Sequence, residues 1–88
     1  MKSSITVTNK LGLHARASAK LTKMAGSFPC QVWLHRGERK VNAKSIMGVM
    51  MLAAGLGATL EIETEGEQEA EAMQALIGLF NDKFGEGE

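Results

Sequence analysis

The sequence has 88 residues, with ten basic and ten acidic side chains, a formal net charge of zero and a single cysteine. This length suits one small domain spanning residues 1–88 and excludes a catalytic domain that carries its own large substrate cleft. The zero net charge argues against nucleic acid as the main partner, because phosphate backbones attract a basic excess, and the single cysteine excludes an internal disulfide framework.

Hydrophobic periodicity predicts a strand and then a helix in the first third of the chain. Ile5 and Val7 alternate with polar residues, which is typical of a strand over residues 5–8 whose apolar side chains face the core. Small and helix-forming residues then take over, and apolar residues recur at helical spacing until Gly26. We therefore expect the first helix over residues 15–26.

The rest of the chain continues with strand and helix patterns. Two alternating stretches around Gly37 predict a hairpin, and an apolar stripe that runs to Phe84 predicts a final amphipathic helix. In chain order, the sequence predicts strand 5–8, helix 15–26, strands 30–35 and 39–42, helix 46–52, strand 59–64 and a helix from about residue 68 to 84. The last four residues, 85–88, are expected to fray.

These elements define the fold class. The order β-α-β-β-α-β-α gives three helices, each with one apolar face, and four strands that also have one apolar face. Such elements bury their apolar surface by stacking in two layers. We therefore predict an α/β (α+β) open-faced two-layer sandwich, with three helices on one face of a four-stranded sheet.

The charges are unevenly distributed along the chain. Residues 1–44 carry nine basic residues against one acidic residue, and residues 45–88 carry one basic residue against nine acidic residues. If the basic half gathers on one surface, the residues between Lys10 and Lys23 would steer an acidic partner or hold an anion. We accordingly include Lys23 among the expected partner-binding residues. The other interpretation is that both halves simply solvate a small domain.

The sequence also indicates a compartment. Its N-terminal residues lack the apolar stretch behind a basic head that a secretion signal needs. The longest uncharged stretch, residues 46–60, contains three glycines and is shorter than the roughly 20 apolar residues that span a bilayer. We expect a cytoplasmic protein without direct membrane insertion.

His14 is the residue best suited to take part in a chemical reaction. It directly precedes the first predicted helix, whose first backbone N–H groups have no intrahelical partner and favour an anion. A neutral imidazole is nucleophilic and can accept a phosphoryl group, while the guanidinium of Arg16 can neutralise the group in transfer. A histidine at this place is also compatible with a simple loop or cap residue, and spacing alone does not decide between the two interpretations.

Two segments resemble the signature segments of the HPr family, the histidine-containing phosphocarriers of the phosphoenolpyruvate-dependent sugar phosphotransferase system. They are Gly12-Leu13-His14-Ala15-Arg16-Ala17-Ser18-Ala19 and Asn42-Ala43-Lys44-Ser45-Ile46-Met47-Gly48-Val49-Met50-Met51-Leu52. The resemblance covers the whole chain and implies an antiparallel sheet with strand order 1-4-2-3. One departure is Ala17, which stands where most members have proline and should loosen the site modestly.

The resemblance also implies the partners and the chemistry. Enzyme I would phosphorylate His14 on Nδ1, Arg16 would attend the phosphoryl group, and a IIA protein or domain would accept it. The protein would then be a carrier with a transient phosphohistidine rather than an enzyme, and we expect it to be a monomer.

Ser45 has two roles in this interpretation. A serine directly before an apolar run commonly caps a helix by accepting a bond from a first-turn N–H, and we expect such a cap here. The resemblance adds regulation, because in many members an HPr kinase/phosphorylase modifies the matching serine and lowers transfer to the histidine. An added negative charge at that helix terminus would also repel an acidic partner.

Three apolar residues that follow Ser45 are candidates for a docking surface. Ile46, Met47 and Met50 are expected on the outer side of the short helix, and methionine suits surfaces that repack against several partners. The resemblance places this surface beside His14. The competing interpretation is that these side chains belong to the core.

Other chemistry is less well supported. Cys30, His35 and His14 lack the paired spacing that brings metal ligands together, so we expect no metal and no cofactor. A second hypothesis is a regulatory interaction module, of the nitrogen branch or HPr-like, whose partner binding depends on phosphorylation of His14 or Ser45. A nucleic-acid-binding domain is the third hypothesis, which the zero net charge disfavours.

Overall fold

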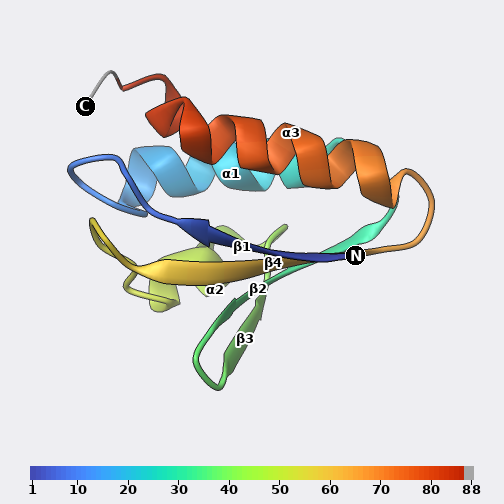
Figure 1. Cartoon of the computed structure of the whole chain (residues 1–88), viewed down its shortest axis with the longest axis horizontal. Coiled ribbons are helices and arrows are strands. Elements are labelled where there is room, and N and C mark those ends of the chain that lie inside the picture. Colours follow the sequence, from blue (N-terminus) through green and yellow to red (C-terminus); the bar gives the residue numbers. More distant parts are fainter. Residues whose placement is uncertain (87–88) are drawn as a thin grey trace.

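The computed structural model describes residues 1–86. Figure 1 shows a sheet with two long helices lying side by side over it. The elements in chain order are β1 (Lys2–Thr6), α1 (Ala15–Gly26), β2 (Gln31–Arg36), β3 (Arg39–Asn42), α2 (Ile46–Met51), β4 (Thr59–Glu65), α3 (Glu69–Asn81) and a short 3-10 turn, η1 (Lys83–Gly85).

The four strands form one antiparallel sheet in the order β1-β4-β2-β3. In the register, Ile5 of β1 lies opposite Leu60 of β4, and Leu34 of β2 lies opposite Ile62 of β4. This pairing puts the apolar residues of neighbouring strands on the same face. The strand order implied by the resemblance, the β-α-β-β-α-β-α order and the predicted fold class are confirmed.

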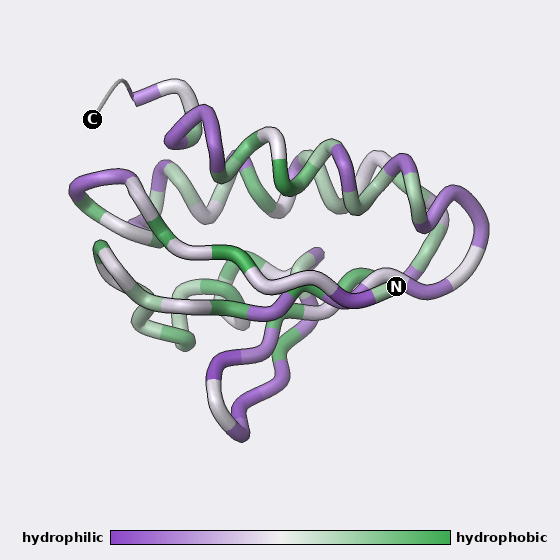
Figure 2. Tube along the Cα trace, in the orientation of Figure 1, coloured by the Kyte–Doolittle hydropathy of each residue, from purple (hydrophilic) through white to green (hydrophobic). Residues whose placement is uncertain are grey.

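One core joins the covered face of the sheet to all three helices. Alternation in the central strands turns every second side chain inward, and the helices contribute residues at helical spacing. The result is one cluster with fully buried members from every layer, including Val32, Leu34, Leu60, Ile62, Leu21, Val49, Leu76 and Phe80. In Figure 2 hydrophobic residues alternate with hydrophilic ones along the helices, while the β2–β3 hairpin is marked by hydrophilic stretches.

The first strand begins earlier than the sequence predicts. We expected it over residues 5–8, but β1 pairs with β4 over Lys2–Thr6. Val7 lies beyond the strand and is nevertheless buried, with its N–H donating to the Ala58 carbonyl at 2.8 Å. The predicted orientation of Val7 toward the core is therefore correct, and only the strand boundary differs.

The end of the chain departs most from expectation. The predicted last helix extends to Phe84, but α3 ends at Asn81, and Lys83 and Phe84 have left-handed φ values of 53° and 56°. Phe84 is buried all the same. The predicted fraying is wrong for residues 85–86, whose contacts are described below; the same prediction for residues 87–88 lies outside the described residues.

The loop after β1, the beginning of α1 and the end of the described chain gather at the same end of the molecule (Figure 1). Each helix within residues 1–86 is too short or too polar to cross a lipid bilayer.

Candidate functional site

His14 occupies the N-cap position of α1. Its backbone is extended, with φ −71° and ψ −180°, so the helix starts with Ala15. Within residues 1–86 no side chain makes a capping hydrogen bond at this terminus, and the first turn contains no acidic residue. The first N–H groups of α1, which have no acceptor within the helix, are therefore left without a side-chain cap. Such a terminus favours an anion.

The loop before His14 is fixed against the segment that follows α2. The Leu13 N–H donates to the Ala54 carbonyl at 2.8 Å, and the buried Ser18 hydroxyl donates to the Leu13 carbonyl at 2.9 Å. Gly12 has φ +64°, and a Cβ placed there would lie 2.4 Å from the Ala54 oxygen. Only glycine meets both conditions, so this residue sets how closely the His14 loop approaches its neighbour.

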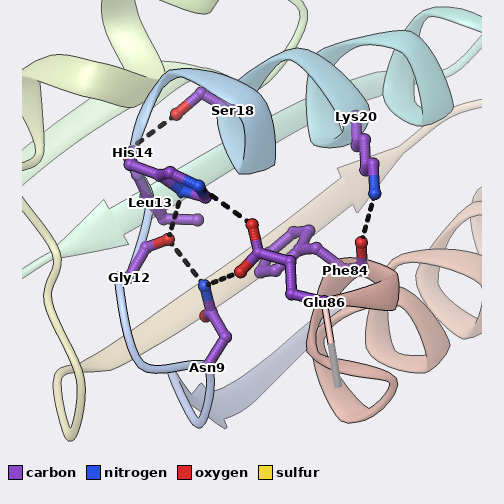
Figure 3. Close-up of polar contacts among 8 residues, drawn as sticks. All are labelled: Asn9, Gly12, Leu13, His14, Ser18, Lys20, Phe84 and Glu86. Carbon is purple, nitrogen blue, oxygen red and sulfur yellow. Dashed lines mark hydrogen bonds and ion pairs between the residues drawn. The ribbon is translucent and has the colours of Figure 1, made fainter. Parts of the chain in front are cut away.

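Both ring nitrogens of His14 face oxygen atoms (Figure 3). Nδ1 lies 3.2 Å from the Gly12 carbonyl oxygen, and Nε2 lies 2.9 Å from a carboxylate oxygen of Glu86. The side chain is 28% exposed, which leaves the ring partly open to a partner. The structure therefore holds the imidazole at the helix start in a defined orientation rather than as a free loop side chain.

Glu86 is the site residue that the sequence did not predict. Its carboxylate is fixed twice, by His14 Nε2 and by Asn9 Nδ2, which donates to it at 2.9 Å and to the Gly12 carbonyl at 2.8 Å. Asn9 is fully buried. Neither residue carries a local sequence signal, because a single acid in a glycine-rich segment is typical of a solvated tail. Their role follows only from the folded chain.

Basic side chains surround this pair. A hollow of about 600 Å³ is lined by Lys10, Leu11, His14, Ala15, Arg16, Lys20, Gly85 and Glu86. Arg16 is exposed and makes no hydrogen bond or ion pair within residues 1–86, whereas Lys20 donates to the Phe84 carbonyl at 2.6 Å. Part of the basic half of the sequence is thus collected around His14, with the guanidinium of Arg16 uncommitted.

Ser45 caps α2. The Gly48 N–H donates to the Ser45 hydroxyl oxygen at 3.2 Å, as expected for a serine at this position. The other end of the helix is held by two arginines that the sequence did not single out. Arg36 donates to the carbonyls of Leu52 and Ala53, each at 2.8 Å, and Arg39 donates to that of Met51 at 2.7 Å. These side chains satisfy carbonyls that a helix end leaves open.

The three predicted docking residues are on the surface. Met47 is 66% exposed, and Ile46 and Met50 are about 40% exposed, while Val49 of the same helix is buried. Sequence reasoning missed four further exposed apolar side chains: Met1, Leu11, Met51 and Leu56. Exposed apolar residues on one short helix are typical of a protein-binding surface.

The remaining predicted residues lie apart from His14. Lys23 is exposed on α1 and lines a separate groove with Lys20, Met24, Ser27 and Leu79, so it does not line the hollow at His14. Cys30 is buried, and His35 bonds a different carboxylate, that of Glu63. Nowhere in residues 1–86 do three His, Cys, Asp or Glu side chains come close enough together to hold a metal ion.

Comparison with known proteins relates this site to a family. Residues 1–82 match the model of the PTS HPr component phosphorylation site. The phosphocarrier protein HPr of Cupriavidus necator is 64% identical over 83 residues, which is 94% of this chain and 93% of that protein.

Solved structures of HPr proteins have the same fold as this chain. HPr-C-His from Thermoanaerobacter tengcongensis superposes with a TM-score of 0.95 at 43% identity, covering 98% of this chain and 97% of that one. An HPr dimer from the same organism gives a TM-score of 0.80 at 45% identity, covering 93% and 94% of the two chains.

The fold and the site together define a small carrier domain that presents a histidine at an open helix terminus. The chain belongs to the HPr family, the phosphocarrier proteins of the phosphotransferase system.

Proposed function

We propose that this protein accepts a phosphoryl group from phosphoenolpyruvate through Enzyme I on Nδ1 of His14 and donates it to a IIA protein or domain. The observation that carries the proposal is the position of His14. A partly exposed imidazole lies at the N-terminus of α1, which has no side-chain cap within residues 1–86, and the unpaired guanidinium of Arg16 lines the same hollow. Relatives with the same fold are phosphocarriers, which supports a carrier role for this histidine.

The chemistry needs only groups that the chain itself supplies. A neutral imidazole attacks phosphorus with the lone pair of Nδ1, and the new phosphoryl group takes the place of the contact between Nδ1 and the Gly12 carbonyl. The first N–H groups of α1 and the guanidinium of Arg16 then stabilise its negative charge. Because the imidazole is also a good leaving group, the same site releases the phosphoryl group to the acceptor.

The protein in this proposal is a monomeric cytoplasmic carrier, modified once and discharged once in each cycle, and it uses no cofactor. Enzyme I is the kinase, and this chain is its protein substrate. Ile46, Met47 and Met50 form the docking surface for both partners, and the exposed charge of Lys23 on α1 adds to the attraction of an acidic partner. Sedimentation of the purified chain tests the monomer, and a single species at twice the monomer mass would contradict it.

A phosphorylation assay tests the proposal. The purified chain is incubated with Enzyme I and labelled phosphoenolpyruvate, beside His14→Ala and the matched control His35→Ala, which removes the other histidine. We expect acid-labile, base-stable label on the wild type and on His35→Ala, and none on His14→Ala. Label that survives in His14→Ala, or a wild type without label, would refute the assignment.

Regulation through Ser45 is the second candidate function, including its stronger form in which the chain acts mainly as an interaction module. The hydroxyl is on an exposed residue and caps the helix that carries the docking methionines. Phosphorylation there would place negative charge beside that surface and weaken docking of an acidic partner.

The test for Ser45 compares the chain before and after treatment with an HPr kinase/phosphorylase. We expect modification of the wild type, none of Ser45→Ala, and slower labelling of His14 in the modified form. Equal labelling rates for the modified and the unmodified chain would exclude this regulation. Partner binding that stays the same after phosphorylation of His14 and of Ser45 would exclude the interaction module.

A further inference from the structure

A neutral histidine carries one N–H, and only the other ring nitrogen is nucleophilic, so the position of that proton decides which nitrogen can accept a phosphoryl group. In His14 the two nitrogens have unequal partners. Nε2 faces the Glu86 carboxylate at 2.9 Å, and Nδ1 faces the Gly12 carbonyl at 3.2 Å. A carboxylate is the stronger acceptor, because a charge-assisted hydrogen bond exceeds one to a neutral carbonyl.

We infer that Glu86 is a positioning residue that holds the proton of His14 on Nε2 and thereby leaves the lone pair of Nδ1 as the phosphoryl acceptor. The inference rests on the proposed function. It adds Glu86, a residue outside the two signature segments, to the site that carries out this function. It goes beyond the presence of a histidine at a helix start, since that position does not by itself select a ring nitrogen.

The carboxylate is fixed well enough to have this effect. Its side chain is only 13% exposed, and its second oxygen accepts a hydrogen bond from Asn9 Nδ2 at 2.9 Å. The same Asn9 nitrogen donates to the Gly12 carbonyl at 2.8 Å, so one buried amide connects the partners of both His14 nitrogens (Figure 3). A carboxylate on a solvated tail would lose this orientation to side-chain entropy.

The backbone before Glu86 supports the same conclusion. Lys83 and Phe84 both adopt left-handed φ values, which are unfavourable for residues with a Cβ. The turn is held by the buried ring of Phe84, which packs edge-on against Phe80 at 4.9 Å between centroids, and by Lys20, which donates to the Phe84 carbonyl at 2.6 Å. Strain that is maintained by packing in this way is typical of segments that aim a functional group.

The proton stays in place through the transfer. The Nδ1 lone pair forms the N–P bond, the bond between phosphorus and its donor atom breaks, and the donor keeps the electron pair. The ring then carries the phosphoryl group on Nδ1 and the proton on Nε2, and its positive charge faces the Glu86 carboxylate. When the acceptor attacks phosphorus, the N–P bond breaks toward Nδ1 and restores the neutral ring with its proton on Nε2.

The test is the tautomer of His14 in Glu86→Gln, beside Glu67→Gln as the matched control. Glu67 is exposed and makes no polar contact within residues 1–86. Nitrogen NMR shifts of the ring at roughly pH 9, where an ordinary imidazole is neutral, report which nitrogen is protonated. The glutamine keeps the shape of the side chain and lets Asn9 donate to its amide oxygen, and a free energy of unfolding equal to the control shows that the fold is retained.

We expect the ratio of Nε2–H to Nδ1–H to fall roughly five- to tenfold in Glu86→Gln, the size of effect expected when a charged acceptor becomes neutral, and labelling by Enzyme I to slow in proportion to the fraction of Nε2–H that is lost. The control should match the wild type in both. An unchanged tautomer ratio, or a labelling rate that does not follow the measured fraction of Nε2–H, would overturn the inference. The tautomer is measured without a phosphoryl donor. A wild type that takes no label would therefore refute the proposed function, and the tautomer ratio would still show whether Glu86 holds the proton on Nε2.

Discussion

The chain contains two histidines, and each pairs with a glutamate. His14 Nε2 lies 2.9 Å from Glu86, and His35 Nε2 lies 2.7 Å from Glu63. As pairs they are nearly equivalent in distance and exposure. Their surroundings separate them, because His14 begins a helix beside an uncommitted guanidinium, whereas His35 lies within β2 of a regular sheet.

The His35–Glu63 pair, called the sheet pair below, has neighbours whose charges are already paired. Lys40 lies 3.9 Å from the Glu63 carboxylate and 4.7 Å from the centre of the Trp33 ring, so its charge is already engaged. At the other pair, the charge of Arg16 has no partner within residues 1–86, and the first N–H groups of α1 have no side-chain cap. The two pairs therefore differ in the unsatisfied donors around them, since the described surroundings of His14 offer such donors to an anion and those of His35 do not.

The largest expected effect concerns the glycines beside the two pairs. Gly12 and Gly37 have nearly the same φ, +64° and +60°, but a Cβ at Gly12 would lie 2.4 Å from the Ala54 oxygen, and at Gly37 it would meet nothing within 4 Å. Gly12→Ala should lower the free energy of unfolding by about 3 kcal/mol or more, through a left-handed residue and a steric clash. Urea unfolding followed by Trp33 fluorescence measures the loss.

Gly37→Ala is the matched control, because it has the strain without the clash. We expect it to cost about 1 kcal/mol. Equal losses in the two variants would show that the close approach of the His14 loop to Ala54 does not constrain the site.

A smaller effect is expected from the cations. Arg16→Ala should slow phosphoryl transfer roughly 10- to 100-fold, as loss of a group that stabilises developing charge does, and change the free energy of unfolding by less than about 0.5 kcal/mol. Rapid-quench measurement of labelling gives the first quantity, and urea unfolding gives the second. Lys40→Ala, at the sheet pair, should leave the transfer rate unchanged. A rate that falls equally in both variants would indicate a general charge effect in place of a local one.

The end of the molecule that holds His14 was predictable only in part. The start of α1 after His14 and the cap by Ser45 follow from local signals, and local signals determine helix starts because capping involves neighbouring residues. The sheet order required the resemblance, because periodicity does not specify which strands pair.

Glu86 was not predictable, and the reason is physical. Its position depends on the left-handed Lys83 and Phe84, a conformation that local propensity disfavours and that burial of Phe84 imposes. The apolar stripe correctly identified Phe84 as a core residue, but it assigned the side chain to a continuous helix. A tertiary contact ended the helix, and the same contact brings an acid from the opposite end of the sequence to His14.

The smallest effect is a pH dependence at the sheet pair. The hydrogen bond from His35, followed by the positive charges of Lys40 and Lys2, holds the pKa of the Glu63 carboxyl below its ordinary value of 4.5. A lowered pKa means that the folded chain binds this proton less readily than the unfolded chain. The stabilisation is therefore complete above pH 4.5 and is lost as the pH falls below it. The advantage of the wild type over Glu63→Gln in urea unfolding should shrink in that range.

The source of this dependence is tested in a His35→Ala background. Because the bond from His35 is the largest cause of the lowered pKa, the pH-dependent difference between Glu63 and Glu63→Gln should be reduced there, while the charge of Lys40 preserves a remainder. A difference that keeps its full pH dependence without His35 would mean that the lysines alone hold the carboxylate. The sheet pair would then be an ion pair with an adjacent histidine, and its likeness to the His14–Glu86 pair would be one of distance only.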